Sequence, residues 1–217
     1  MRARMALAVS GQRCELREIM LKSKPPEMLA ASPKATVPVL VLPDGSVIEQ
    51  SLDIMRWALQ QHDPEGWLAA DSAVVNGLIA ANDGPFKHDL DRYKYPNRYA
   101  GEHAGDGKAF AESHRSGAAL WLMELEALLS HHGWLYGPSA SLADMAILPF
   151  VRQFAHTDAS WFAEQPWPHL VGWLAGWESG ALFARVMGKY SPWQAEQPRV
   201  EFPPVDSDLA MSPSANS

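Results

Sequence analysis

The sequence predicts a mixed α/β domain followed by an all-helical domain. Short apolar or alternating segments, typical of β-strands, lie before residue 62, whereas apolar residues at helical spacing dominate from residue 71 onward. Between these regions, residues 63–66 include a proline and a glycine, which favour a turn. We therefore expect an α/β domain at residues 1–62, a linker at 63–70 and an all-helical domain at 71–195.

The α/β domain opens with a predicted helix over residues 1–10. Its apolar face carries Met5, Ala8 and Val9. Gly11 is suited to end this helix. Residues 14–21 alternate apolar and charged side chains, which predicts a half-buried strand. Residues 25–31 begin with two prolines, which the first turn of a helix tolerates.

A predicted β-hairpin follows, with strands at residues 39–42 and 47–48 joined by the turn pair Asp44-Gly45. Pro38 precedes the first strand. Proline cannot donate a hydrogen bond to a neighbouring strand, so it belongs at a strand start or edge, and its peptide bond is a candidate for the cis form. The backbone of Val37 is then left free to pair with something other than protein.

After the hairpin, Ser51 is expected to cap a helix whose apolar face holds Ile54, Met55, Ala58 and Leu59. The free N–H groups at a helix N-terminus favour an anion. A free strand edge beside such a helix end would suit an acidic, peptide-like small molecule.

In the helical domain, Asp71 and Ser72 are expected to cap the first helix, and the Gly-Pro pair at 84–85 to interrupt it. Further helices are predicted at residues 86–95, 109–131, 141–151 and 170–177. From residue 196 to 217 the chain is rich in Pro, Ser and Asp and has few large apolar residues, so we expect a disordered tail.

Composition excludes several classes of protein. Hydrophobic residues make up 47% of the chain and charged residues 20%, values typical of a soluble globular protein. The net charge of −7 argues against nucleic acid or an anionic membrane as a partner, and no apolar run approaches the ~20 residues of a membrane span. Cys14 is the single cysteine, so no internal disulfide can form, and we expect a cytoplasmic protein.

Four segments in this order resemble the cytosolic glutathione transferases, and in particular their omega-like branch. They are Leu21 to Glu27, Val37-Pro38-Val39-Leu40, Gln50-Ser51, and Ser141-Leu142-Ala143-Asp144. The resemblance covers about residues 1–195. It implies a thioredoxin-like N-terminal domain that binds glutathione, followed by the family's helical bundle.

The resemblance also implies roles for individual residues. Val37, before Pro38, would pair backbone to backbone with the cysteinyl part of glutathione. Gln50 and Ser51 would hold the γ-glutamyl carboxylate, and Lys24 would also contact glutathione. Ser141 and Asp144 would form a structural capping box. Glutathione would be a cosubstrate, with no cofactor and no metal, and a homodimer is usual in the family.

The sequence departs from the family at its start. In the family a β-strand and a catalytic loop precede the first helix, whereas this sequence begins within the equivalent of that helix. We therefore name no catalytic residue, expect it upstream of Met1, and interpret Met1 as an internal methionine of a longer protein. Cys14 lies on a predicted strand rather than at a helix N-terminus, where a thiolate is favoured, and is expected to be a bystander.

The segment 86–95 is a second candidate site. Lys87, His88, Arg92 and Tyr93 could form one wall of a second-substrate pocket at the domain interface; the alternative is a solvated helix face. His131 and His132 are adjacent on a predicted helix and point in different directions, so we expect no shared metal there.

Two functions remain open from the sequence. The first is an enzyme that transfers glutathione to an electrophile or reduces a mixed disulfide, with the thiolate as nucleophile. The alternative is a non-catalytic binding or regulatory protein of the same fold, which the missing catalytic loop favours. A nucleic-acid-binding module is disfavoured by the charge and by the lack of a recognised motif.

Overall fold

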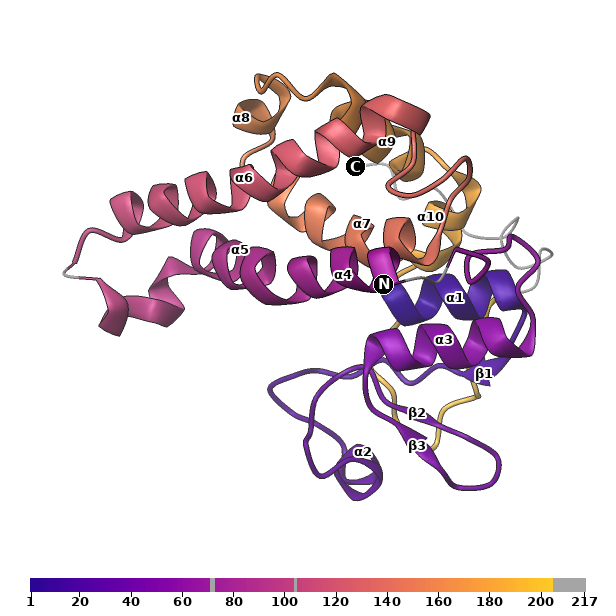
Figure 1. The fold of residues 1–217 in the computed structure, drawn as a ribbon. Helices are drawn as coiled ribbons and strands as arrows, with labels where there is room; N and C mark the ends of the chain where they lie inside the picture. Colours follow the sequence, from indigo (N-terminus) through magenta and orange to yellow (C-terminus); the bar gives the residue numbers. More distant parts are fainter. Residues whose placement is uncertain (71–72, 104, 205–217) are drawn as a thin grey trace, which may run out of the picture. The chain divides into compact units, whose positions relative to one another are not determined.

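The computed structural model describes residues 1–70, 73–103 and 105–204 (Figure 1). The chain forms two compact units. Unit 1 comprises Met1–Glu65 and Ser179–Ser217, and unit 2 is Gly66–Glu178. The division after Glu65 lies inside the predicted linker. The predicted cap at Asp71 and Ser72, and residues 205–217 of the predicted tail, lie outside the described residues.

Unit 1 is built around a helical pair. Its helices are α1 (Arg2–Ser10), α2 (Pro26–Ala31), α3 (Ser51–Gln61) and α10 (Ala181–Val186). α1 runs beside α3 and also packs on α10 (Figure 1). The sequence predicts one buried face for α1, but the structure buries nearly all of it, because two helices cover it. α1 ends at Gly11, which takes the left-handed conformation with φ 70°.

The strands of unit 1 are short. They are β1 (Cys14–Glu15), β2 (Leu40–Val41), β3 (Val47–Ile48) and β4 (Glu201–Phe202). β2 and β3 form the predicted antiparallel hairpin, with Leu40 opposite Ile48. The strand predicted over residues 14–21 is wrong in length, since only two residues pair. Its antiparallel partner β4 is followed directly by Pro203, which cannot donate a further ladder hydrogen bond.

The disordered tail predicted from residue 196 is also wrong for the part that the structure describes. Phe202 is fully buried, and its strand pairs with Cys14 and Glu15. Upstream, the Trp193 N–H donates to the Glu18 carbonyl at 2.7 Å. The Phe202 ring is buried, and the Trp193 ring packs against the Arg17 guanidinium, 4.4 Å from the ring centroid. Local composition does not reveal these long-range contacts.

The C-terminal end of the helical domain lies elsewhere than predicted. The sequence places residues 179–195 in that domain, but α10 packs on α1 and belongs to unit 1. Val186 of α10 is buried in this contact region. Unit 1 is therefore assembled from both ends of the described chain.

Unit 2 is helical, as predicted. Its elements are α4 (Ala73–Ala81), the π-helix η1 (Asn82–Phe86), α5 (Lys87–Lys94), the 3-10 helix η2 (Pro96–Glu102), α6 (Gly107–His132), α7 (Leu142–Ala155), α8 (Ala159–Ala163) and α9 (Pro168–Glu178). The Gly-Pro pair at 84–85 does not break the helix; a π-turn carries the chain from α4 into α5, because a wider turn accommodates a proline without an N–H.

α7 is the buried helix of unit 2, and its capping box is confirmed. The Ser141 N–H donates to the Asp144 carboxylate at 2.9 Å, and the Ser141 hydroxyl donates to the same oxygen at 2.8 Å. Around α7, α5 and α6 run side by side (Figure 1). None of the helices in the described part of the chain combines the length and the hydropathy that a membrane span requires.

Candidate functional site

The hairpin brings the two predicted binding segments to one end of unit 1. β2 and β3 pair with Leu40 opposite Ile48. The same register, continued by three residues beyond each strand, would set Val37 opposite Ser51. Both segments therefore leave the hairpin at its open end, away from the turn at Asp44 and Gly45.

Val37 is accessible at this end. Its side chain and backbone together are 48% exposed, and the peptide bond between Val37 and Pro38 is cis, the form that the sequence made a candidate. Among the described residues, the Val37 N–H and carbonyl have no hydrogen-bond partner. An exposed backbone donor and acceptor side by side can receive an extended peptide-like ligand.

The N-terminus of α3 is uncapped, and here the prediction for Ser51 is corrected. The N-cap residue is Gln50, in extended conformation, and it makes no capping hydrogen bond through its side chain. Ser51 is instead the first residue of the helix. The prediction failed because a serine can cap a helix only from the position before it. The first N–H groups of α3 thus remain available to an anion, at the positive end of the helix dipole.

Glu49 holds the two segments in place, a role that the sequence analysis did not assign. The Ser32 hydroxyl donates to the Glu49 carboxylate at 2.5 Å, and the Lys34 ammonium lies 3.0 Å from its other oxygen. The Ser32 hydrogen bond, followed by that of Lys34, lowers the pKa of Glu49. These contacts tie the residue before Gln50 to the loop that leads into Val37. No local pattern marks such a long-range contact.

Lys24 lies in the loop before α2 and is half-buried. A turn precedes it, closed by the Ser23 N–H and the Met20 carbonyl at 2.9 Å. The place of Lys24 in the binding site remains a prediction.

Cys14 is half-buried in β1. Burial raises the pKa of its thiol, against a smaller opposing effect of Arg4. The thiolate is the nucleophilic form, so this environment disfavours reactivity. The geometry agrees with the expectation of a bystander and leaves the site without a catalytic residue among those described.

The four residues predicted for a second-substrate pocket all lie on α5, in unit 2. Tyr93 is buried in the core, with its ring 5.1 Å from that of Phe154. Lys87 pairs with Asp91 one turn later on the same helix. Arg92 donates two hydrogen bonds, at 2.7 and 2.8 Å, to the carboxylate of Glu102. A pocket lined by these residues remains a prediction.

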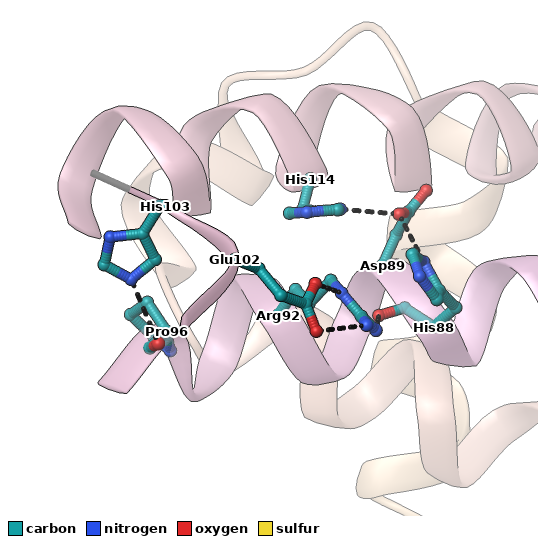
Figure 2. A network of polar contacts seen from close by, with 7 residues as sticks. All are labelled: His88, Asp89, Arg92, Pro96, Glu102, His103 and His114. Atoms are coloured by element: carbon teal, nitrogen blue, oxygen red, sulfur yellow. Dashed lines mark hydrogen bonds and ion pairs between the residues drawn. The ribbon is translucent and has the colours of Figure 1, made fainter. Parts of the chain in front are cut away.

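His88, the fourth of them, belongs to a cluster that the sequence analysis missed. Its Nδ1 lies 3.0 Å from Asp89 Oδ1, and His114 Nδ1 lies 2.7 Å from the same oxygen (Figure 2). His114 comes from α6, twenty-five residues away in sequence. No short-range signal links it to α5, whereas the adjacent His131 and His132, at the end of α6, were the pair that the sequence made visible.

Family models match both units. The model described as "Glutathione S-transferase, N-terminal domain" matches residues 1–66, and "Glutathione S-transferase, C-terminal domain" matches residues 121–176. Together they cover more than half of the chain. No curated protein matches it at a significant level.

Solved structures share the fold. A glutathione transferase family member from Pseudomonas fluorescens, determined with two glutathione bound, is 20% identical, with a TM-score of 0.71 over 85% of this chain and 86% of that one. A glutathione S-transferase from Xylella fastidiosa is 20% identical (TM-score 0.72, 85% and 90% covered). One from Rhodospirillum rubrum is 24% identical (TM-score 0.66, 88% of each chain).

The matched models and the observed architecture agree. Unit 1, with its antiparallel hairpin and the uncapped α3, is the thioredoxin-like domain that the resemblance implies. Unit 2, with the buried α7 and its capping box, is the helical domain. The chain belongs to the glutathione S-transferase family.

Proposed function

We propose that this protein binds glutathione at the open end of the β2–β3 hairpin and transfers it to an electrophile or uses it to reduce a mixed disulfide. The observation that carries the proposal is that two free hydrogen-bonding groups lie at the same end of the hairpin. They are the backbone of Val37 and the uncapped N-terminus of α3. Glutathione has a matching pair, a cysteinyl backbone and a γ-glutamyl carboxylate.

Each residue has a defined part in this proposal. The Val37 N–H and carbonyl pair with the cysteinyl backbone. Pro38, which has no N–H to donate, separates this free backbone from the strand β2 that follows. The carboxylate lies on the N–H of Ser51, with the Ser51 hydroxyl and the exposed Gln50 amide beside it. Lys24 contributes a further positive charge.

The reaction follows from the thiol of the bound glutathione. Its thiolate attacks an electrophilic carbon, a C–S bond forms, and the leaving group departs with the bonding electrons. In the alternative reaction the thiolate attacks a mixed disulfide of glutathione, forming oxidised glutathione and releasing the other thiolate. The family resemblance also supports a cytoplasmic location and a homodimer. Size-exclusion chromatography tests the homodimer.

The first prediction concerns Ser51→Pro. Proline is tolerated at the first position of a helix, and Gln50 already has the extended conformation that a following proline requires, so α3 should persist without this N–H. Loss of a hydrogen bond to a charged group costs about 1.5–3 kcal/mol, which corresponds to roughly 10–150-fold weaker glutathione binding. Isothermal titration calorimetry measures the change.

Two variants serve as controls. Ser51→Ala keeps the N–H and should lose less affinity than Ser51→Pro. Ser46→Ala removes a hydroxyl at the opposite, turn end of the hairpin, where it bonds Asp44, and should leave binding unchanged. Equal affinity of Ser51→Pro and wild type would rule out the α3 N-terminus as the carboxylate site.

A second candidate function is glutathione binding without catalysis. The observation that favours it is the position of Cys14, the single cysteine, which is half-buried in β1 rather than at a helix N-terminus and so is poorly placed to form a mixed disulfide. Reduction of β-hydroxyethyl disulfide and conjugation of an aryl halide, both with glutathione, separate the two functions. Glutathione binding by the protein with neither activity would establish the non-catalytic function.

A further inference from the structure

We propose that His88, Asp89 and His114 form a binding site for a divalent first-row transition-metal ion of the zinc class. The three residues come from α5 and α6 of unit 2, which pack side by side. One ligand atom from each residue lies within 4.8 Å of the other two. The proposal is independent of glutathione binding, which concerns residues of unit 1.

His88 and Asp89 are adjacent on α5, yet their ligand atoms meet, with His88 Nδ1 3.0 Å from Asp89 Oδ1. Zinc–ligand bonds of about 2.0–2.1 Å at tetrahedral angles place neighbouring ligand atoms roughly 3.3 Å apart. His114 Nδ1 and His88 Nδ1 lie 2.7 and 3.0 Å from Asp89 Oδ1. Both separations need to widen by only roughly 0.3–0.6 Å, which small side-chain rotations supply. Figure 2 shows both Nδ1 atoms in contact with the Asp89 carboxylate, and the metal would take the place of the protons that such contacts require.

The donor set selects the class of ion. Two imidazole nitrogens and one carboxylate oxygen suit zinc, cobalt, nickel or copper, whereas magnesium and calcium prefer oxygen ligands alone. The positive charge of Arg92, one turn after His88 on α5, is partly neutralised. The guanidinium of Arg92 is bound by both carboxylate oxygens of Glu102, which offsets its charge and lowers the pKa of Glu102.

Gly117 keeps room for the carboxylate. It lies one turn after His114 on α6, and a Cβ at this position would stand 2.6 Å from Asp89 Oδ2. Glycine inside a helix costs about 1 kcal/mol relative to alanine, so the residue has a packing reason to be there. The three atoms nearest to that Cβ position all belong to the Asp89 carboxylate.

The two imidazoles of the cluster differ in their surroundings: His114 is packed against another ring, whereas His88 is exposed to solvent. The Phe110 ring packs edge-on against His114, with centroids 4.5 Å apart, which restricts the orientation of that imidazole. The side chain of His88 is 54% exposed. The metal would therefore reach the site from solvent on the side of His88, and water would complete its coordination.

The test is titration of the protein with Co²⁺, followed by visible absorption, and then competition with Zn²⁺, at a pH about one unit above the ordinary histidine pKa of about 6.5. We expect saturable binding that Zn²⁺ displaces and Mg²⁺ does not. His88→Gln is the main variant, because an exposed side chain can be changed without loss of folding. It should bind at least tenfold more weakly, the smallest loss expected even for an outer-shell partner.

The control is His156→Gln. His156 is also exposed, with a side chain 52% accessible, and also contacts a carboxylate, that of Glu178 at 2.7 Å. Its replacement should leave Co²⁺ binding unchanged. Gly117→Ala should weaken binding by displacing Asp89, although alanine favours the helix. Absence of saturable Co²⁺ binding by the wild type, or equal binding by wild type and His88→Gln, would overturn the proposal.

Discussion

Single carboxylates organise both units through contacts that are distant in sequence. Asp144 is fully buried and accepts hydrogen bonds from the Leu135 N–H, both donors of Ser141 and the indole N–H of Trp173. Burial raises its pKa in spite of these donors. Only the contact with Ser141 was predictable, since it lies within one helical turn; the others exist because α9 and the loop before α7 close over the carboxylate.

Glu49 allows a prediction of pH dependence. Its pKa is lowered in the folded state by the Ser32 hydroxyl and then by Lys34. A lowered folded pKa adds stability above the unfolded pKa of about 4.3, and this stability is lost as the pH falls through the folded value. Glu49→Gln should therefore be less stable than wild type at neutral pH, and the difference should shrink in acid. Urea unfolding at several pH values measures it.

The control for this experiment is Glu196→Gln, an exposed glutamate in the turn before β4. Its replacement should produce no pH-dependent difference from wild type. A Glu49→Gln variant whose deficit stays constant between neutral and acidic pH would show that the carboxylate is not ionised more readily in the folded state.

At the scale of elements, β4 determines whether the edge of β1 is covered. Phe202 is 0% exposed, and Cys14 lies opposite it. Phe202→Ala should lower the free energy of unfolding by about 3–5 kcal/mol, the usual cost of removing a buried aromatic ring. Val200 is 42% exposed, and its backbone carbonyl accepts a hydrogen bond from the Leu16 N–H. Any residue at position 200 would keep this backbone hydrogen bond. Val200→Ala should therefore change stability by less than about 0.5 kcal/mol.

Equilibrium unfolding in urea compares the two variants. The arrangement also predicts a secondary effect, because an uncovered strand edge promotes association between chains. Phe202→Ala should aggregate more readily than Val200→Ala. Equal stability of the two variants would contradict the pairing of the C-terminal segment with β1.

The whole molecule is two units, of which the first is discontinuous in sequence. The segment from Ser179 supplies α10 and β4 to a unit that otherwise ends at Glu65 (Figure 1). Val186 and Phe202, both buried, belong to this segment. A domain of about 60 residues is marginally stable even when its core is complete.

We therefore predict that a fragment of residues 1–65 does not fold by itself. Addition of a peptide of residues 179–204 should restore helical circular dichroism and a cooperative thermal transition. The same peptide with Phe202→Ala is the matched control and should restore much less. Cooperative unfolding of residues 1–65 without any peptide would contradict this prediction.

Features that depend on neighbours within about one turn or one hairpin could be predicted from the sequence alone. These include the end of α1 at Gly11, the hairpin turn at Asp44 and Gly45, and the box of Ser141 and Asp144. The order of motifs also determined the family. Local backbone preference is enough for each of these features, because the interacting groups are close in the chain.

Three long-range contacts became visible only in the folded structure. They are the pairing of β1 with β4, the hydrogen bond and ion pair of Ser32 and Lys34 with Glu49, and the cluster of His88, Asp89 and His114. Each of these joins segments that no local preference connects, and each depends on which apolar faces bury one another. The hydrophobic effect is nondirectional, and many residues are apolar enough to be buried. A single sequence therefore does not tell which apolar faces pack against each other. The candidate metal cluster and the covered strand edge are consequences of that packing.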